Sequence, residues 1–341
     1  MKVAILGWYH QNNAGDDRLL YCLETKLHSL GIKDIHVFIA WNDLKNRIDE
    51  INSCDFLLVG GGGLILRNTN GQIKSFENIN IPYGLVGVSV DDVGTDNADF
   101  IAYLSKQSKF ILVRDTFSYE AFNSHTKEHL FLAPDLTFLY PYQSKDSKII
   151  TNKVAVSLRP WHANPFKQYS KNYHRFNRWS RRFPLLPKFL GLWDPEAFIN
   201  ILKTIVSERL IAFPLYINPK KGDDVLMSQY LESSQSKDFD IHILRQSDYL
   251  IGMRLHAVIF ATQMGIPFIA LNYASKVRNY VEDLGLADYI LEVKNYKAIN
   301  SKIAHLKAHQ ESISKQLLLK TDQYAKEVHG TFDAIYKTYM T

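Results

Sequence analysis

One stretch of this chain, residues 247–276, constrains the possible fold more than any other. It reads SDYLIGMRLHAVIFATQMGIPFIALNYASK. Two short apolar runs flank an apolar helical segment at 257–264, a pattern typical of a strand–helix–strand unit with buried parallel strands. Gly252, Arg254 and His256 lie where the first strand ends and the helix begins. Because open α/β sheets bind ligands at this edge, the stretch predicts a ligand site together with a fold.

Arg254 and His256 suit chemistry on an anion. The start of a helix carries unpaired N–H groups and a partial positive charge, to which Arg254 adds a full one. Histidine is the side chain that most readily transfers a proton near neutral pH. The alternative is a surface feature without a role, but an unpaired charge is costly to bury in so apolar a segment. We therefore predict that both residues are catalytic, with side chains that converge only if they lie in the turn before the helix.

The whole chain predicts a two-domain α/β protein. Its 341 residues exceed one typical hydrophobic core. Short apolar strands alternate with helical stretches in both halves, as they do in βαβ units. We place the first domain at 1–145 and the second at 152–310, and we expect the last helices, at 311–341, to pack back on the first domain.

Apolar runs and helical periodicity place the individual elements. Strands are expected at 3–6, 35–39, 56–59, 84–88, 110–113, 130–132, 153–157, 210–217, 241–243, 249–251 and 268–271. Helices are expected at 19–30, 97–107, 116–123, 195–209, 223–232, 257–264, 302–319 and 324–339.

Composition argues against several classes of protein. The net charge of +5 and the pI near 8.9 are mildly basic, which fits an anionic ligand but is too weak to indicate nucleic acid. No apolar run reaches transmembrane length, and the first apolar run is too short for a signal peptide. The two cysteines, Cys22 and Cys54, lack metal-ligand spacing. We therefore expect no metal site, two buried thiols and a cytoplasmic location.

Further cations follow other strands. Arg114 and Arg159 each come directly after an expected strand, and Lys276 lies near a helix start. Arginines at separate strand ends can pair with separate anionic groups of one ligand. We predict that these three residues bind the same anion as Arg254 and Gly252. The alternatives are a surface ion pair for Arg114 and a solvated side chain for Lys276.

Two loops near the start of the chain form a second candidate site. Their residues are Asn12, Asn13, Gly15 and Asp16 after the first strand, and Gly61, Gly62 and Gly63 after the third. Glycine permits the close approach of a ligand or of another backbone, and it permits positive φ. The spacing matches neither a dinucleotide-binding fingerprint nor a P-loop. A tight turn and a helix cap without any ligand explain these residues about as well.

Residues 161–193 are unlike the rest of the chain. Aromatic side chains there alternate with Lys and Arg over a segment too long for a simple connection. Aromatic rings beside cations suit sugar rings, single-stranded nucleic acid or a membrane interface. We expect contact with a sugar acceptor or with a membrane surface. The alternative is a loop or small subdomain with solvated charges.

Several motifs, in order along the chain, are similar to those of one family. They are the loop at 7–17, the glycine run at 60–63 with Leu64, Val113-Arg114-Asp115, Ala133-Pro134-Asp135, Gly252-Met253-Arg254-Leu255-His256-Ala257, Gly265-Ile266-Pro267 and Tyr273-Ala274-Ser275-Lys276. Together they resemble the polysaccharide pyruvyltransferase family over most of the chain. The motif around Arg254 and His256 is specific. Residues 161–193 match no segment of the family, and His10 stands where the family more often has glycine.

The resemblance implies a fold and a reaction. The fold is α/β and GT-B-like, with two Rossmann-like domains whose parallel sheets face a central cleft. The reaction transfers pyruvate from phosphoenolpyruvate to a sugar of a cell-surface polysaccharide or of its lipid-linked precursor. It forms a cyclic ketal and releases phosphate, with no metal or nucleotide cofactor and no nucleic acid partner. We expect a cytoplasmic protein, peripheral at the inner face of the membrane through residues 161–193.

The resemblance also implies roles for individual residues. His256 is the expected proton donor to the enol carbon. The expected donor-binding residues are Arg114, Arg159, Gly252, Arg254 and Lys276. The loops at 12–16 and 61–63 are expected to bind the sugar acceptor from the first domain, with Asp16 positioning a hydroxyl or serving as a base.

Two other functions compete with this interpretation. The first is a GT-B glycosyltransferase with a nucleotide-sugar donor, because fold alone does not separate such an enzyme from a pyruvyltransferase. The second is a non-catalytic protein that binds glycan or nucleic acid through residues 161–193. The donor distinguishes the two enzymes, and binding without turnover would identify the third function.

Overall fold

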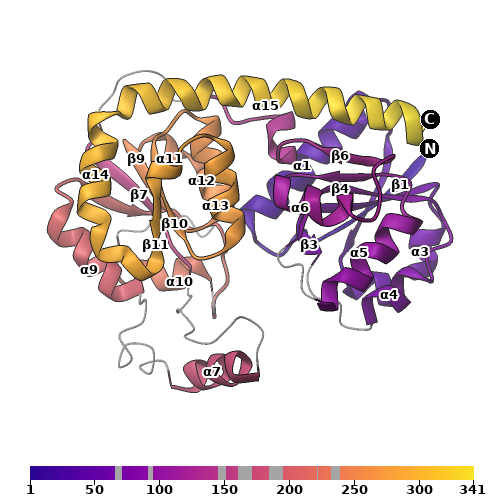
Figure 1. Ribbon diagram of the computed structural model, residues 1–341, viewed down its shortest axis with the longest axis horizontal. Helices are drawn as coiled ribbons and strands as arrows, with labels where there is room; N and C mark the ends of the chain where they lie inside the picture. Colours follow the sequence, from indigo (N-terminus) through magenta and orange to yellow (C-terminus); the bar gives the residue numbers. More distant parts are fainter. Residues whose placement is uncertain are drawn as a thin grey trace. The chain divides into compact units, whose positions relative to one another are not determined.

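The computed structural model describes residues 1–65, 71–90, 95–144, 151–159, 171–183, 195–220, 222–231 and 239–341 (Figure 1). It divides into two compact units. Unit 1 comprises Met1–Tyr142 and Leu319–Thr341, and unit 2 comprises Gln143–Leu318. In each unit, helices surround a parallel sheet (Figure 1).

Unit 1 is built on a six-stranded parallel sheet in the order β2-β1-β3-β4-β5-β6. The strands are β1 (Lys2–Gly7), β2 (Asp34–Ile39), β3 (Phe56–Ile65), β4 (Tyr83–Val90), β5 (Ile111–Val113) and β6 (Leu130–Leu132). The helices are α1 (Ala14–Ser29), α2 (Asn42–Asn46), α3 (Ile48–Asn52), α4 (Gly71–Phe76), α5 (Thr95–Gln107), α6 (Thr116–Asn123) and the 3₁₀ turn η1 (Leu136–Leu139). All eight residues of β4 are buried, as expected for a strand that is covered on both faces.

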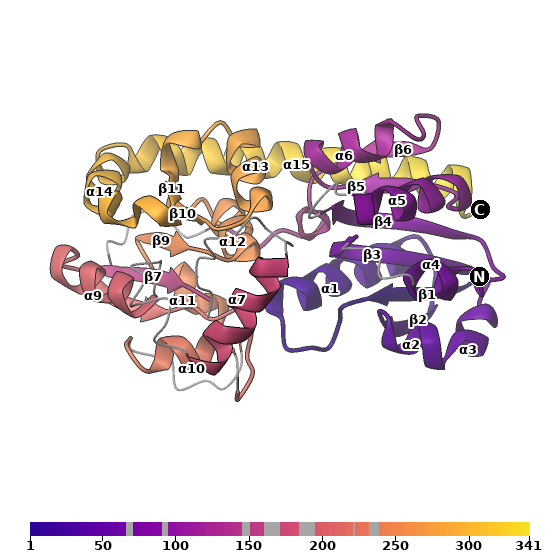
Figure 2. The same cartoon turned by 60° about the horizontal axis from the view of Figure 1, so that its bottom comes forward.

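Unit 2 is built on a five-stranded parallel sheet in the order β11-β10-β9-β7-β8. The strands are β7 (Lys153–Ser157), β8 (Arg209–Ala212), β9 (Tyr249–Gly252), β10 (Phe268–Asn272) and β11 (Ile290–Glu292). The helical elements are α7 (Lys171–Arg182), α9 (Pro195–Ile205), α10 (Asp223–Ser228), α11 (Ile241–Arg245), α12 (Leu255–Gln263), α13 (Ser275–Asp283), η2 (Ala287–Tyr289), η3 (Val293–Ala298) and α14 (Ile299–Ala308). Helix α15 (Gln310–Tyr339) begins in this unit, and its residues from Leu319 onward belong to unit 1. Figure 2 shows β10, β9 and β7 side by side within this unit.

Most of the expected strands and helices are confirmed, and several differ from expectation for physical reasons. The strand expected at 241–243 is wrong, because these residues begin α11. The side chain of Asp240 caps this helix by accepting a hydrogen bond from the N–H of His242 at 2.9 Å. A three-residue apolar run does not distinguish a strand from a helical turn.

The glycine run does not interrupt the third strand, contrary to expectation. β3 continues through Gly60–Gly63 and pairs with β4 up to Ile65, with an irregularity in register after Gly62. Near the end of the chain, the two helices expected at 302–319 and 324–339 are instead α14 and the 30-residue α15. The sequence analysis also missed β11, which forms the edge of the second sheet beside β10, whereas α13 begins where a helix start was expected, next to Lys276.

No helix in the described part of the chain combines the length and the apolar character that a membrane span requires.

Candidate functional site

Unit 2 brings three predicted cations to one edge of its sheet. β7, β9 and β10 are neighbours, and Arg159, Arg254 and Lys276 each lie within four residues of the end of one of these strands. Because the strands are parallel, their carboxyl ends meet at the same edge. All three side chains are partly exposed, so a ligand in solution can reach them.

Tyr273 contacts one of these cations and lies in the electric field of all three. The Nη1 atom of Arg159 donates a hydrogen bond to the hydroxyl of Tyr273 at 3.0 Å, and the guanidinium carbon lies 5.1 Å from the centre of the ring. Burial disfavours the phenolate. The charges of Arg159, Lys276 and Arg254 outweigh that cost and lower the pKa of Tyr273 below its ordinary value. Three cations therefore act on one oxygen atom, which is the electrostatic signature of a site for an anion.

Arg254 is held by a carboxylate that the sequence analysis did not single out. It lies just before α12 in extended backbone geometry, and its Nε and Nη2 atoms donate to the two oxygens of Asp223 at 2.9 and 2.5 Å. Asp223 is fully buried and also accepts a hydrogen bond from the N–H of Tyr216 at 3.1 Å. Burial raises the pKa of Asp223, and the guanidinium of Arg254 opposes that rise. A bidentate pair of this kind fixes the plane of the guanidinium.

His256 occupies the first turn of α12, two residues after Arg254. It is partly exposed, and its ring centre lies 6.0 Å from that of Phe260, one turn later on the same helix. The extended backbone at Arg254 places that residue before the helix, and its side chain contacts Asp223 and lies over the ring of Tyr216. The two predicted catalytic side chains thus leave the same short segment, with contacts to different neighbours.

Gly252 ends β9 between the two strands that supply Arg159 and Tyr273. It is buried, and in register it lies opposite Ser157 on one side and Ala270 on the other. A Cβ atom at this position would lie 3.0 Å from a methyl carbon of Leu250. Packing of the sheet end is therefore sufficient reason for glycine here.

The predicted acceptor residues lie together in unit 1. Asn13 caps α1 by accepting from the N–H of Gly15 at 3.3 Å, and its amide nitrogen donates to Asp16 at 2.5 Å. Gly62 has φ of 90°, and a Cβ atom there would lie 3.0 Å from Oδ1 of Asp16. Glycine therefore lets the carboxylate of Asp16 approach the backbone of β3 closely.

The loop between β1 and α1 holds two residues in the left-handed region. His10 and Asn12 both have φ of 56°, and both are exposed. The N–H of His10 donates to Asp17 at 2.7 Å, and Tyr9, fully buried, donates its hydroxyl to the carbonyl of Gly60. Left-handed backbone at residues other than glycine is uncommon and is enriched at functional sites. The contact between Tyr9 and Gly60 fastens this loop to the glycine run, which brings Gly61, Gly62 and Gly63 beside it.

Arg114, a predicted donor-binding residue, lies in unit 1 and pairs with a carboxylate there. Its side chain is only 5% exposed and forms a salt bridge with Asp135 at 2.8 Å inside unit 1. A second nitrogen donates to the hydroxyl of Ser89 at 2.9 Å. The other oxygen of Asp135 accepts from Thr137. Arg114 therefore belongs to the framework of unit 1, and the ion pair is buried rather than at the surface.

Asp223 and Tyr273 are the residues that sequence reasoning missed. Asp223 lies 31 residues before Arg254 at the start of an expected helix, where an acidic residue is ordinary. Tyr273 belongs to a motif of the family, but nothing in its local sequence indicates three nearby cations. Within the described ranges, no group of three or more His, Cys, Asp or Glu residues is placed to hold a metal ion.

Comparison with solved structures identifies the fold. The structure is similar to the HepE protein of Anabaena in complex with UDP-glucose, with a TM-score of 0.55 at 10% identity, covering 97% of this chain and 99% of that one. It is also similar to UDP-N-acetylglucosamine 2-epimerase from Rickettsia bellii, with a TM-score of 0.51 at 11% identity, covering 100% of this chain and 99% of that one. The fold is therefore GT-B-like, with two parallel α/β sheets.

Comparison with known sequences identifies the family. The family model for polysaccharide pyruvyl transferase matches residues 13–275. The chain is 24% identical over 308 residues to pyruvyl transferase 1 of Schizosaccharomyces pombe, which covers 82% of this chain and 68% of that protein. It is 27% identical over 122 residues to the amylovoran biosynthesis protein AmsJ of Erwinia amylovora, which covers 34% of this chain and 28% of that protein. The matched segment contains every predicted acceptor residue except Asn12, together with Arg159, Arg254 and His256. The chain belongs to the polysaccharide pyruvyl transferase family, among the transferases of polysaccharide synthesis.

Proposed function

We propose that this chain transfers pyruvate from phosphoenolpyruvate to two hydroxyls of a sugar in a cell-surface polysaccharide or in its lipid-linked precursor. The product is a cyclic pyruvate ketal, and phosphate is released. The donor carries its own leaving group, so the reaction needs no metal or nucleotide cofactor. The observation that carries this proposal is that Arg159, Arg254 and Lys276 follow the ends of three neighbouring strands at one edge of the sheet, where Arg159 also donates to the hydroxyl of Tyr273.

The donor fits this edge of unit 2 by charge. Phosphoenolpyruvate has a carboxylate and a phosphate, and each is best held by guanidinium or ammonium groups and by the start of a helix. Arg159 and Arg254 supply two guanidinium groups, and Lys276 lies in the first turn of α13. The bidentate pair with Asp223 holds the side chain of Arg254 in one orientation before the donor binds. Binding therefore loses less conformational entropy at this side chain.

The chemistry assigns one proton donor. The enol carbon gains a proton and becomes a methyl group, and one sugar hydroxyl bonds to the neighbouring carbon. The second hydroxyl then replaces the phosphate, which leaves with the electrons of its C–O bond. Of the two hydroxyl protons released, one balances the new methyl group and the other leaves with phosphate. His256 is the proposed general acid, because a partly exposed imidazole beside the anion site can deliver a proton near neutral pH.

The acceptor is assigned to unit 1. Asp16, held by Asn13 and close to Gly62, is the proposed partner of an attacking hydroxyl. The exposed left-handed turn at Asn12 lies beside it in the same loop. We further propose that the protein acts on the cytoplasmic side, at the inner face of the membrane, where a lipid-linked acceptor would be presented.

Phosphate release from phosphoenolpyruvate, measured with a panel of synthetic and lipid-linked glycosides, tests the proposal. We expect release that depends on the acceptor. His256→Ala should lower kcat by about 10²–10⁴-fold, the range for loss of a general acid. Arg254→Ala should lower it by about 10²–10³-fold, the range for loss of one charge-stabilising donor.

Two matched variants serve as controls. Arg209→Ala changes an exposed arginine at the start of β8, at the opposite edge of the same sheet, and His242→Ala changes an exposed histidine on α11. Both should retain wild-type turnover. If phosphoenolpyruvate neither binds nor turns over while UDP-glucose raises the melting temperature, the nucleotide-sugar alternative replaces this proposal.

A further inference from the structure

The positive charge of this protein is concentrated in one segment. Residues 161–193 contain seven Lys and Arg and no Asp or Glu, whereas the whole chain contains 40 Lys and Arg against 35 Asp and Glu. The rest of the chain therefore carries 33 basic against 35 acidic residues and is slightly acidic. The basic character of the protein comes from this segment alone. Such a concentration of charge indicates a partner with a negatively charged surface.

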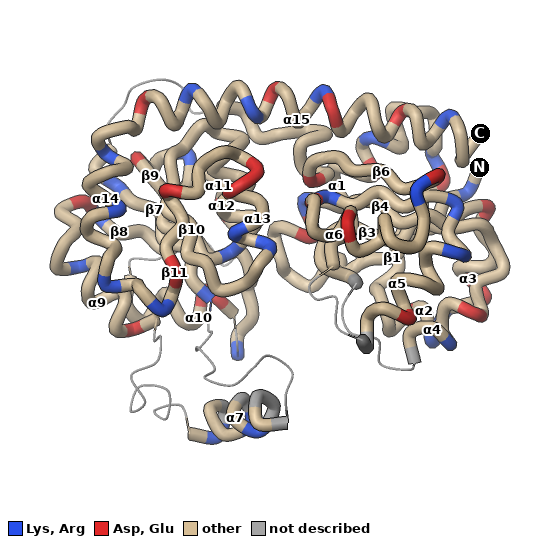
Figure 3. The backbone as a smooth tube through the Cα atoms, in the orientation of Figure 1, with Lys and Arg blue, Asp and Glu red and all other residues tan. Residues whose placement is uncertain are grey.

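Helix α7 organises this charge into a stripe. At about 100° per residue, Lys171, Arg175, Arg178 and Arg182 fall within an arc of about 60° on the helix. Figure 3 shows Lys and Arg along α7 and no Asp or Glu. Such spacing aligns the cations along one side of the helix over its whole length, which a flat anionic surface can meet simultaneously.

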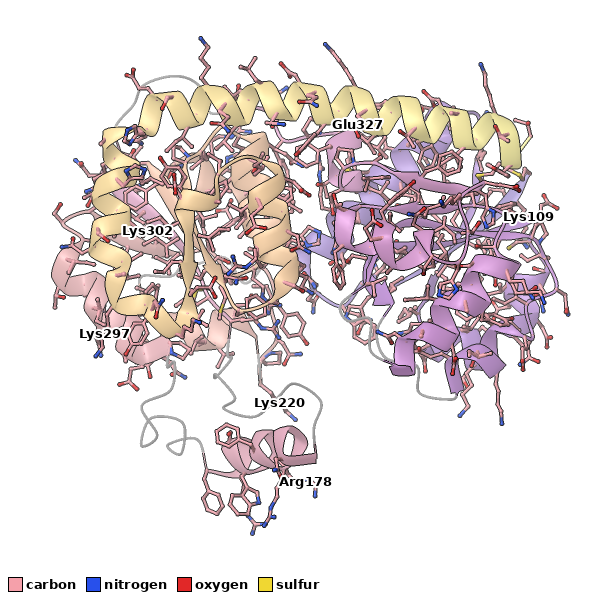
Figure 4. All side chains as sticks on the ribbon, viewed as in Figure 1. Lys109, Arg178, Lys220, Lys297, Lys302 and Glu327 are labelled. Atoms are coloured by element: carbon pink, nitrogen blue, oxygen red, sulfur yellow. The ribbon has the colours of Figure 1, made fainter. Side chains whose placement is uncertain are left out.

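Aromatic rings border the stripe and face solvent. Trp179, about a quarter-turn from the cations, is 48% exposed, and Phe183, the first residue after α7, is 57% exposed. Arg175 lies over the ring of Trp179 at 4.9 Å. Arg182 is exposed, and so is Arg178, which is labelled in Figure 4. Phe176, further round the helix, is buried. The exposed side of α7 thus combines a row of cations with two large rings that water solvates poorly.

We propose that α7 attaches this protein to a membrane surface through anionic lipid headgroups. The cations would contact lipid phosphates, while Trp179 and Phe183 would enter the boundary between headgroups and acyl chains, where aromatic rings are enriched. A lipid surface accounts for both parts of the pattern, since it offers dense negative charge and an apolar layer directly beneath it. A nucleic acid or an acidic glycan would also attract the cations. Such a partner explains the exposed rings beside the stripe less well than a lipid surface does.

This inference deepens the proposed function by naming a partner, and its test does not depend on that function. A lipid-linked acceptor would be presented at the same surface. The measurement below contains neither donor nor acceptor, so failure of pyruvyl transfer and failure of membrane attachment are separate results.

Co-sedimentation of the full chain with vesicles tests the inference. We expect binding to phosphatidylcholine vesicles that contain phosphatidylglycerol, weak binding to pure phosphatidylcholine, and a steep loss of binding as salt rises. One basic residue near an anionic surface improves partitioning by about fivefold. The triple variant Arg175→Gln/Arg178→Gln/Arg182→Gln should therefore bind on the order of a hundredfold more weakly, and the corresponding Glu variant more weakly still. Trp179→Ala/Phe183→Ala should lose binding even at low salt.

A control with the same change of net charge separates the helix from general electrostatics. Lys109, Lys203 and Lys297 are exposed and lie outside residues 161–193; two of them are labelled in Figure 4. Replacing these three by Gln should leave vesicle binding within about threefold of wild type. Three outcomes would overturn the inference. The two Gln variants could lose binding equally, or the protein could fail to bind the anionic vesicles. Single-stranded RNA could also bind α7 more tightly than the vesicles do and displace the protein from them. Far-UV circular dichroism of each variant establishes that the fold is intact.

Discussion

At the scale of single residues, a buried carboxylate determines where the central arginine points. Asp223 is fully buried, accepts two hydrogen bonds from Arg254 in bidentate geometry, and accepts another from the N–H of Tyr216. Asp223 therefore acts through Arg254 as a positioning residue. Loss of such a residue should lower kcat more than it lowers donor affinity, because the positive charge that attracts the donor remains.

Asp223→Asn tests this role. The variant keeps the shape of the side chain but removes half of the ion pair, so the free energy of unfolding should fall by about 3 kcal/mol. We expect kcat to fall by at least about tenfold, while donor affinity, measured by calorimetry, is retained because the positive charge remains. Asp224→Asn is the matched control, since Asp224 is the next residue of the same helix and accepts its hydrogen bond from the N–H of Asn218. Equal kcat values in the two variants would contradict the positioning role.

Tyr273 makes a second prediction at this scale, on pH. Arg159, Lys276 and Arg254 together lower its pKa, so the empty site favours the phenolate more than water does. A bound anion would neutralise these cations and raise the pKa again, so binding takes up a proton. Donor affinity should therefore fall as pH rises through the pKa of Tyr273 in the free protein. Calorimetry of phosphoenolpyruvate binding across pH checks this, and Tyr273→Phe should lose that dependence above neutral pH.

At the scale of elements, irregular strands shape unit 1. β4 shifts register against β5 between Val86 and Val88, and the residue between them, Gly87, has φ of 62°. A Cβ atom there would lie 2.5 Å from the side chain of Leu136. A bulge of this type needs glycine, because left-handed backbone and close packing coincide at one residue. Sequence patterns place the strand, but they do not reveal the bulge.

Two glycine substitutions should have opposite effects on stability. Gly87→Ala combines backbone strain with a clash and should lower the free energy of unfolding by about 1–3 kcal/mol. Gly330→Ala, in the middle of α15, adds a Cβ that meets nothing within 4 Å and should raise it by about 0.5–1 kcal/mol, because alanine favours helix. Urea denaturation of both variants gives the two values. A destabilised Gly330→Ala would show that unseen packing constrains this face of the helix.

At the scale of the whole molecule, one helix contributes to both units. Residues 310–318 of α15 belong to unit 2, where Gln316 donates to the carbonyl of Leu284. The remainder belongs to unit 1, where Asp333 pairs with Lys26 at 2.6 Å and Phe332 is 1% exposed. The core of unit 1 therefore depends on residues nearly 200 positions beyond the end of its last strand, at Leu132.

Phe332→Ala measures this dependence. The side chain is buried in unit 1, so its loss should cost about 3–5 kcal/mol of unfolding free energy. Leu319→Ala on the same helix is the control, because Leu319 is 62% exposed and its loss should change that energy by less than about 0.5 kcal/mol. Denaturant titration with a probe in each unit compares the variants. Similar curves for the two variants would show that this part of α15 is dispensable to unit 1.

The sequence by itself determined much of the fold and half of the donor site. Local apolar runs identified β1, β7, β9 and β10, because a parallel strand that is buried on both faces is apolar along nearly its whole length. The segment around Arg254 and His256 identified the family, because its motif is local and specific. Short runs such as 241–243 failed, since a few apolar residues fit a strand and a helical turn equally well.

Only the tertiary structure decided which charges act together. The sheet order places β9 between β7 and β10, and this brings Arg159 to Tyr273 across 114 residues. Tertiary contacts also pair Asp223 with Arg254, and they bury Arg114 in a salt bridge with Asp135. The sequence gives the type of each side chain, but which partner it meets depends on strand order and on burial. Both are settled by contacts between distant segments, and no local pattern in the sequence encodes them.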